Sequence, residues 1–151
     1  MSPFDKTPPS QTDSIAFEFD LKHRPQRVWR ALTDPALLSE WVLPVVGLEL
    51  LPGAAFKLRT DPHPGWDGTV DCKVIEVEAE KKLSYTWVVG DMLDTVVTFT
   101  LTPTATGTRL SLVQSGFKPD QKQNFGGARY GWNLMGNKLV DLLGKLELGG
   151  E

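Results

Sequence analysis

Hydrophobic and polar residues alternate along much of the chain, which is the pattern of half-buried β-strands. The first clear run covers residues 14–21, and six more runs follow between residues 45 and 115, joined by short turns. Short connections join neighbouring strands in antiparallel order. The pattern therefore predicts a seven-stranded, mainly antiparallel meander with one apolar face.

Two irregularities interrupt this pattern. Alternating apolar positions from Val46 to Leu50, a Pro52-Gly53 turn and a second alternating run predict a hairpin. Later, the alternation of apolar and polar residues shifts by one position between Val74 and Ile75, which predicts a bulge or a change of buried face.

Two short helices are predicted directly after the first strand. The Arg24-Pro25 pair suits a helix start, because proline at the first helical position has the required φ angle, and we expect this helix to end near Leu32. Asp34-Pro35 repeats the signal, since an aspartate side chain caps free backbone N–H groups. A second short helix through Trp41 follows.

A long amphipathic helix is predicted at the C-terminus, starting at either Pro119 or Gly126. Apolar residues recur every three or four positions, at Phe125, Ala128, Trp132, Met135, Leu139, Leu142 and Leu146. Four glycines interrupt this stretch, and each costs about 1 kcal/mol relative to alanine in an exposed helix. We expect a close backbone approach, or a kink near Gly131, to compensate.

Residues 1–13 carry three prolines among small polar residues and show no periodicity, which predicts a disordered N-terminal arm. Residues 14–148 are then expected to form a single α+β domain. The chain of 151 residues, 40% of them hydrophobic, is long enough for one core.

Charge and apolar run length exclude some partners. With 16 basic and 19 acidic side chains the net charge is −3, which provides no basic surface for nucleic acid. No apolar run approaches the roughly 18 residues that indicate a membrane span. We therefore expect a cytoplasmic protein with no membrane span and no nucleic-acid partner.

The residues that usually carry catalysis are scarce. Cys72 is the only cysteine and His23 and His63 are the only histidines, so we expect no disulfide, no metal and no cofactor. An acidic loop around His63 has prolines and irregular spacing unlike a calcium loop. Aromatic residues are plentiful, with five Trp, seven Phe and two Tyr. These either fill a core or line a cavity.

Four stretches in order resemble a known family. They are RPQRVWRALTDPALLSEW (24–41), VDCKVIEVEAEKKLSYTW (70–87), TRLSLVQSGF (108–117) and the Gly131-Trp132 pair. Together they resemble the family related to the activator of Hsp90 ATPase (AHSA1-like), within the START-like (Bet v 1-like, SRPBCC) superfamily.

The resemblance implies a helix-grip fold: a curved seven-stranded antiparallel sheet wrapped around the C-terminal helix, often over a cavity for an apolar small molecule. The sequence differs from the family pattern before Gly131, where Gly127-Ala128-Arg129-Tyr130 replaces an acidic or His-rich stretch.

The candidate cavity residues are drawn from the abundant aromatic side chains and from positions that strand alternation or helical spacing places on the buried face. Trp66 and Met92 lie in predicted loops at the cavity mouth. The polar candidates are Arg59, Tyr85, Gln114, Arg129 and Tyr130, of which Gln114 and Arg129 are not included in the cavity set given below. An arginine inside an apolar cavity would indicate an anionic ligand. The full set is Trp41, Phe56, Leu58, Arg59, Trp66, Tyr85, Trp87, Met92, Val97, Phe99, Phe117, Tyr130, Trp132 and Met135.

Three functions are compatible with this sequence. The first is non-catalytic binding of a hydrophobic or amphipathic small molecule. The second is a chaperone-related interaction with a protein partner, and a homodimer is a further alternative. The third is a cyclase-like or hydrolytic enzyme that uses the cavity, which the scarcity of histidine and cysteine disfavours.

Overall fold

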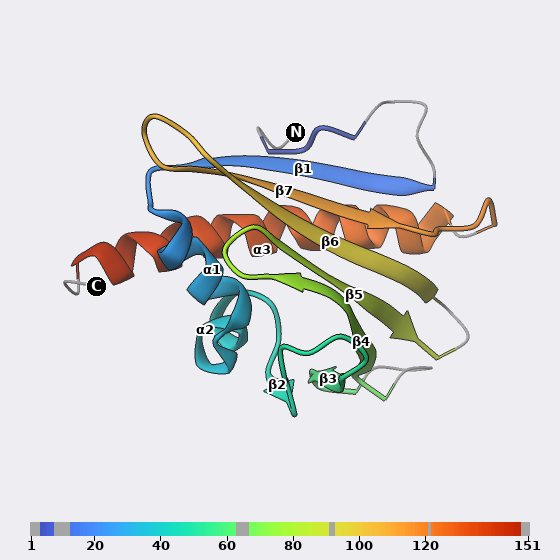
Figure 1. The fold of residues 1–151 in the computed structure, drawn as a ribbon. Helices are drawn as coiled ribbons and strands as arrows, with labels where there is room; N and C mark the ends of the chain where they lie inside the picture. Colours follow the sequence, from blue (N-terminus) through green and yellow to red (C-terminus); the bar gives the residue numbers. More distant parts are fainter. Residues whose placement is uncertain (1–3, 8–12, 63–66, 91–92, 121, 149–151) are drawn as a thin grey trace.

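A computed structural model describes residues 4–7, 13–62, 67–90, 93–120 and 122–148. Its described strands form one seven-stranded sheet in the order β1-β7-β6-β5-β4-β3-β2, and every neighbouring pair is antiparallel (Figure 1). This confirms the predicted seven-stranded antiparallel sheet: β2 to β7 follow one another as the predicted meander, whereas β1 pairs with β7. The strands are β1 (Ser14–Leu21), β2 (Val45–Val46), β3 (Ala55–Arg59), β4 (Thr69–Glu78), β5 (Lys82–Val89), β6 (Leu93–Pro103) and β7 (Thr108–Ser115).

The two short helices are α1 (Pro25–Thr33) and α2 (Pro35–Trp41), close to their predicted bounds. Asp34 caps α2 as its sequence suggests, because its carboxylate accepts a hydrogen bond from the backbone N–H of Ala36 at 3.0 Å. Both helices lie near the C-terminal half of α3 (Lys122–Leu148), which crosses one face of the sheet (Figure 1).

The core lies between α3 and the facing side of the sheet. Trp132 and Leu139 of α3 are buried, as are the alternate residues of β1, β6 and β7 that face them. Trp132 meets Phe99 of β6 edge to face, with ring centroids 6.2 Å apart. This burial of the helix stripe against a curved sheet confirms the α+β helix-grip fold.

The predicted bulge is present in β4. The register with β5 shifts between Val74 and Glu76, Val74 is buried, and Ile75 is 47% exposed. The predicted hairpin before β4 is shorter than expected. Strand β2 ends at Val46 because Gly47 adopts a φ of +79°, so the alternation through Leu50 does not belong to a strand.

The N-terminal residues differ from the predicted disordered arm over residues 4–7. Backbone hydrogen bonds join Lys6 N–H to the carbonyl of Ala16, and Glu18 N–H to the carbonyl of Phe4, so this segment lies along β1. The ring of Phe4 also packs against that of Phe19, tilted by 37° with ring centroids 4.6 Å apart. Proline content alone did not indicate these contacts, because they depend on the exposed edge of β1. The rest of residues 1–12 lies outside the described residues.

Candidate functional site

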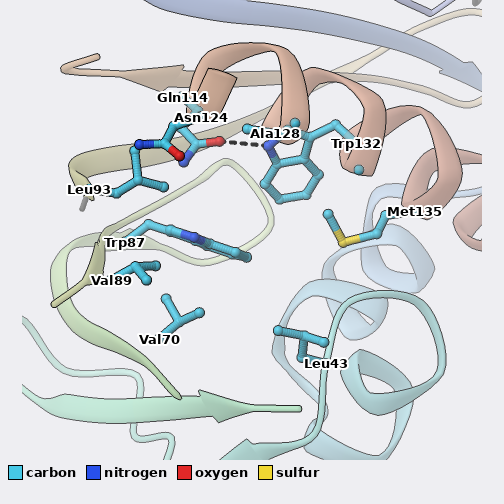
Figure 2. Close-up of a pocket in the computed structure, with 12 residues that line it drawn as sticks. Leu43, Val70, Trp87, Val89, Leu93, Gln114, Asn124, Ala128, Trp132 and Met135 are labelled. Atoms are coloured by element: carbon cyan, nitrogen blue, oxygen red, sulfur yellow. Dashed lines mark hydrogen bonds between the residues drawn. The ribbon is translucent and has the colours of Figure 1, made fainter. Parts of the chain in front are cut away.

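A partly open pocket of about 440 Å³ lies between α3 and the strands β4, β5, β6 and β7 (Figure 2). Strand residues and the segment after α2 form one side, and α3 forms the other. Its lining is Leu43, Val70, Trp87, Val89, Leu93, Gln114, Asn124, Gly127, Ala128, Gly131, Trp132 and Met135. None of these side chains is ionisable, so the described lining provides apolar contacts and neutral hydrogen bonds.

Two tryptophans are the largest side chains of the described lining. Trp87 of β5 and Trp132 of α3 are tilted by 55° with ring centroids 5.6 Å apart. Trp132 is buried, whereas Trp87 is only half-buried, and Met135 lies one turn further along α3 (Figure 2). Rings and a thioether of this kind suit flat or irregular apolar molecules.

Small residues on α3 create the space opposite these rings. Asn124, Gly127, Ala128 and Gly131 share one helical face at spacings of three and four. A Cβ added at Gly127 would meet nothing within 4 Å, and one at Gly131 would meet only the Met135 methyl, at 3.8 Å. The pocket thus accounts for glycines that the sequence left unexplained. Gly131 itself makes no close approach to another element, and α3 continues through it.

A chain of hydrogen bonds fixes the polar end of the pocket. The indole N–H of Trp132 donates to Oε1 of Gln114 at 2.8 Å, and Nε2 of Gln114 donates to Oγ1 of Thr95 at 2.9 Å. The Thr95 hydroxyl donates in turn to the backbone carbonyl of Trp87 at 2.8 Å. Gln114 and Thr95 are each 1% exposed, so this chain holds their side chains in fixed orientations within the core.

The structure places the predicted cavity residues in four groups. Trp87, Trp132 and Met135 line the pocket. Arg59 and Tyr130 are exposed and lie away from it, because Arg59 alternates with buried Leu58 and Tyr130 is on the outer side of α3. Trp66 and Met92 lie outside the described residues. The other seven are core residues outside the lining: Trp41, Phe56, Leu58, Tyr85, Val97, Phe99 and Phe117.

Two buried side chains that could in principle react, those of Cys72 and Tyr85, are held in their neutral forms. Burial raises the pKa of the Cys72 thiol to about 12, with a further contribution from neighbouring Asp71, so the thiol stays protonated at neutral pH. Burial also raises the pKa of Tyr85, whose hydroxyl makes no hydrogen bond to the described residues. Neither residue belongs to the pocket lining.

Sequence reasoning missed several lining residues. Leu43 lies outside regular structure, and Asn124 precedes the apolar stripe of α3, so neither had a periodic signal. Gly127 and Gly131 did carry a signal, because glycines at helical spacing leave a hollow on one face. Within the described ranges, no three His, Cys, Asp or Glu side chains gather as metal ligands. Nor does any helix there have the length and apolarity to cross a membrane.

A curved sheet gripping a long helix, with a pocket between them, defines a helix-grip protein of the START-like superfamily. The family profile described as activator of Hsp90 ATPase homolog 1-like protein matches residues 22–144. The chain belongs to this family, as its four sequence stretches suggested. The family and fold are compatible with ligand binding in a cavity and with a chaperone-related role.

Solved structures agree with this assignment. Protein MLL2253 from Mesorhizobium loti is 42% identical, with a TM-score of 0.80 over 87% of this chain and 97% of its own. Protein CV1439 from Chromobacterium violaceum is 26% identical, with a TM-score of 0.71 over 87% and 98%. DynU16, from the dynemicin biosynthetic locus, shares the fold at 24% identity and a TM-score of 0.72, over 88% of this chain and 48% of DynU16. No curated protein matches the sequence significantly.

Proposed function

We propose that this protein binds a hydrophobic or amphipathic small molecule, without chemical conversion, in the pocket between α3 and the sheet. The observation that carries the proposal is an apolar pocket of about 440 Å³ walled by Trp87 and Trp132. This volume falls within the roughly 300–1,000 Å³ of small-molecule sites. Because the described lining has no ionisable side chain, it favours binding over acid–base catalysis.

A neutral dye tests the proposal directly. N-phenyl-1-naphthylamine becomes fluorescent in apolar surroundings and is titrated into the full-length protein. A Gly131→Leu variant fills the pocket from α3, so we expect its affinity for the dye to fall at least tenfold, on the order of 1.4 kcal/mol.

Gly126→Leu is the matched control, because Gly126 is exposed on the same helix and is not part of the lining. Both substitutions replace a helical glycine with leucine, so they share the gain in helix propensity. Dye binding that is unchanged in Gly131→Leu, or equally weakened in both variants, would contradict binding in this pocket. Native mass spectrometry of freshly purified protein then looks for a co-purified molecule.

The outer side of α3 supports a second candidate function, a chaperone-related interaction. Tyr130 and Leu134, one turn apart there, are 67% and 48% exposed, and exposed apolar surface is typical of a binding site for another protein. The test is stimulation of Hsp90 ATP hydrolysis by the wild-type protein and by a Tyr130→Ser/Leu134→Ser variant. Equal rates with and without the wild-type protein would exclude this function.

A further inference from the structure

The hydrogen-bond chain determines which way round the Gln114 amide lies. The indole N–H of Trp132 can only donate, so the group that faces it must be the amide oxygen of Gln114. The amide nitrogen then faces Thr95, whose hydroxyl accepts one N–H and donates its own hydrogen to the Trp87 carbonyl. The flipped amide would place two donors against each other at Trp132.

One of the two N–H groups of the Gln114 side-chain amide remains without a hydrogen-bond acceptor among the described residues. An amide nitrogen carries two hydrogens, and the second hydrogen of Gln114 has no acceptor among the described residues. Gln114 is 1% exposed and lines the pocket, where it lies with Asn124 at one end in Figure 2. A buried donor without an acceptor is unfavourable, so an acceptor atom on a bound molecule would stabilise this end of the pocket.

The rest of the lining selects against charge. Arg59, the cation that the sequence offered as a partner for an anionic ligand, is exposed on the other side of β3. An anionic ligand would therefore lose its hydration with no cation among the described lining side chains to compensate. A neutral oxygen has a much smaller hydration free energy to lose.

Building on the proposed function, we propose that the ligand is a neutral aromatic molecule with a carbonyl-type oxygen that accepts a hydrogen bond from the side-chain amide of Gln114. Its ring lies against Trp87 and Trp132, and its oxygen points to the polar end of the pocket. Aryl ketones, quinones and aryl esters belong to this class, whereas aryl carboxylates and plain hydrocarbons do not.

Three probes of nearly equal shape test this class against the wild-type protein by calorimetry or ligand-detected NMR. They are 2-acetylnaphthalene, 2-isopropenylnaphthalene, in which CH₂ replaces the oxygen, and 2-naphthoate, in which the group is anionic. We expect the ketone to bind about fivefold more tightly than the hydrocarbon, as one neutral hydrogen bond gives. The carboxylate is expected to bind at least tenfold more weakly than the ketone.

The outcomes separate this inference from the proposed function. Equal affinities for ketone and hydrocarbon, or tightest binding of the carboxylate, overturn the inference but leave apolar binding in place. If none of the three binds, the inference is overturned, and the dye titration alone decides whether the pocket binds apolar molecules. A lower carbonyl stretching frequency for the bound ketone than for the ketone in hexane supports the hydrogen bond without any variant.

A Gln114→Met variant assigns the donor, because methionine matches glutamine in length but has no N–H group. The ketone and the hydrocarbon are expected to bind this variant with equal affinity, so the measured quantity is the ratio of the two affinities. A ketone preference that persists in Gln114→Met overturns the role of Gln114. If the variant does not fold, since Trp132 loses its acceptor, the wild-type comparison and the carbonyl frequency still decide the inference.

Discussion

The Asp5 carboxylate ties the N-terminal segment to α3. Its side chain is 6% exposed, accepts a hydrogen bond from the Thr7 backbone N–H at 2.9 Å and pairs with Nε of Arg129 at 2.7 Å. Burial opposes ionisation, but these hydrogen bonds and the Arg129 charge outweigh it and hold the pKa of Asp5 below its ordinary 3.8. A lowered pKa means that the ionised carboxylate stabilises the fold.

The Asp5–Arg129 pair should make stability pH-dependent. It contributes above the ordinary pKa of Asp5 and is lost as the pH falls through the lowered value. Asp5→Asn keeps an acceptor for Thr7 but removes the charge, so we expect a loss of about 1–2 kcal/mol in the free energy of unfolding near neutral pH. Urea unfolding at about pH 7 and about pH 3 should show this difference shrinking in acid.

Asp20→Asn is the control, because Asp20 pairs with Arg109 at 3.1 Å but is 75% exposed. Exposed pairs contribute little, so we expect a change below about 1 kcal/mol at either pH. An Asp5→Asn effect of the same size at both pH values would show that the charge of Asp5 does not stabilise the fold.

At the scale of elements, helix α3 uses its glycines for two different purposes. Gly127 and Gly131 leave the pocket open, whereas Gly136 lets the helix backbone approach β1. A Cβ on Gly136 would lie 2.7 Å from Cε1 of Phe19, and Phe19 is itself buried against Phe4. The close approach that the sequence led us to expect is therefore at Gly136.

Gly136→Ala is expected to destabilise the protein by about 1–3 kcal/mol, because overpacking outweighs the improved helix propensity of about 1 kcal/mol. Gly126→Ala, where nothing lies within 4 Å of the added carbon, should instead stabilise by up to about 1 kcal/mol. Chemical denaturation of both variants measures the difference. Two variants that shift stability in the same direction would show that Phe19 does not restrict this position.

At the scale of the whole molecule, the pocket is the point where folding and ligand binding are linked. A ligand that binds only the folded state stabilises it by about 1.4 kcal/mol at tenfold its Kd. For a chain of this length we expect N-phenyl-1-naphthylamine at that concentration to raise the Tm by about 3–6 °C. Thermal melts followed by far-UV circular dichroism measure the shift, which should fall to about 2 °C or less in Gly131→Leu because its affinity for the dye is at least tenfold lower. An equal shift in that variant would place the dye elsewhere.

The sequence by itself determined the number and approximate positions of the strands, the two short helices, the β4 bulge and the family, because all of these follow from local periodicity, caps and motif order, whereas the pairing of β1 with β7 is a feature of the tertiary structure. Tertiary structure decided which aromatics form the pocket wall. Trp87 and Phe99 both have buried-face parity, yet Trp87 lines the pocket and Phe99 packs in the core. Alternation along a strand determines which face of the sheet a side chain lies on. Whether a pocket forms beside that side chain depends on the residues that α3 places opposite it, such as Gly131.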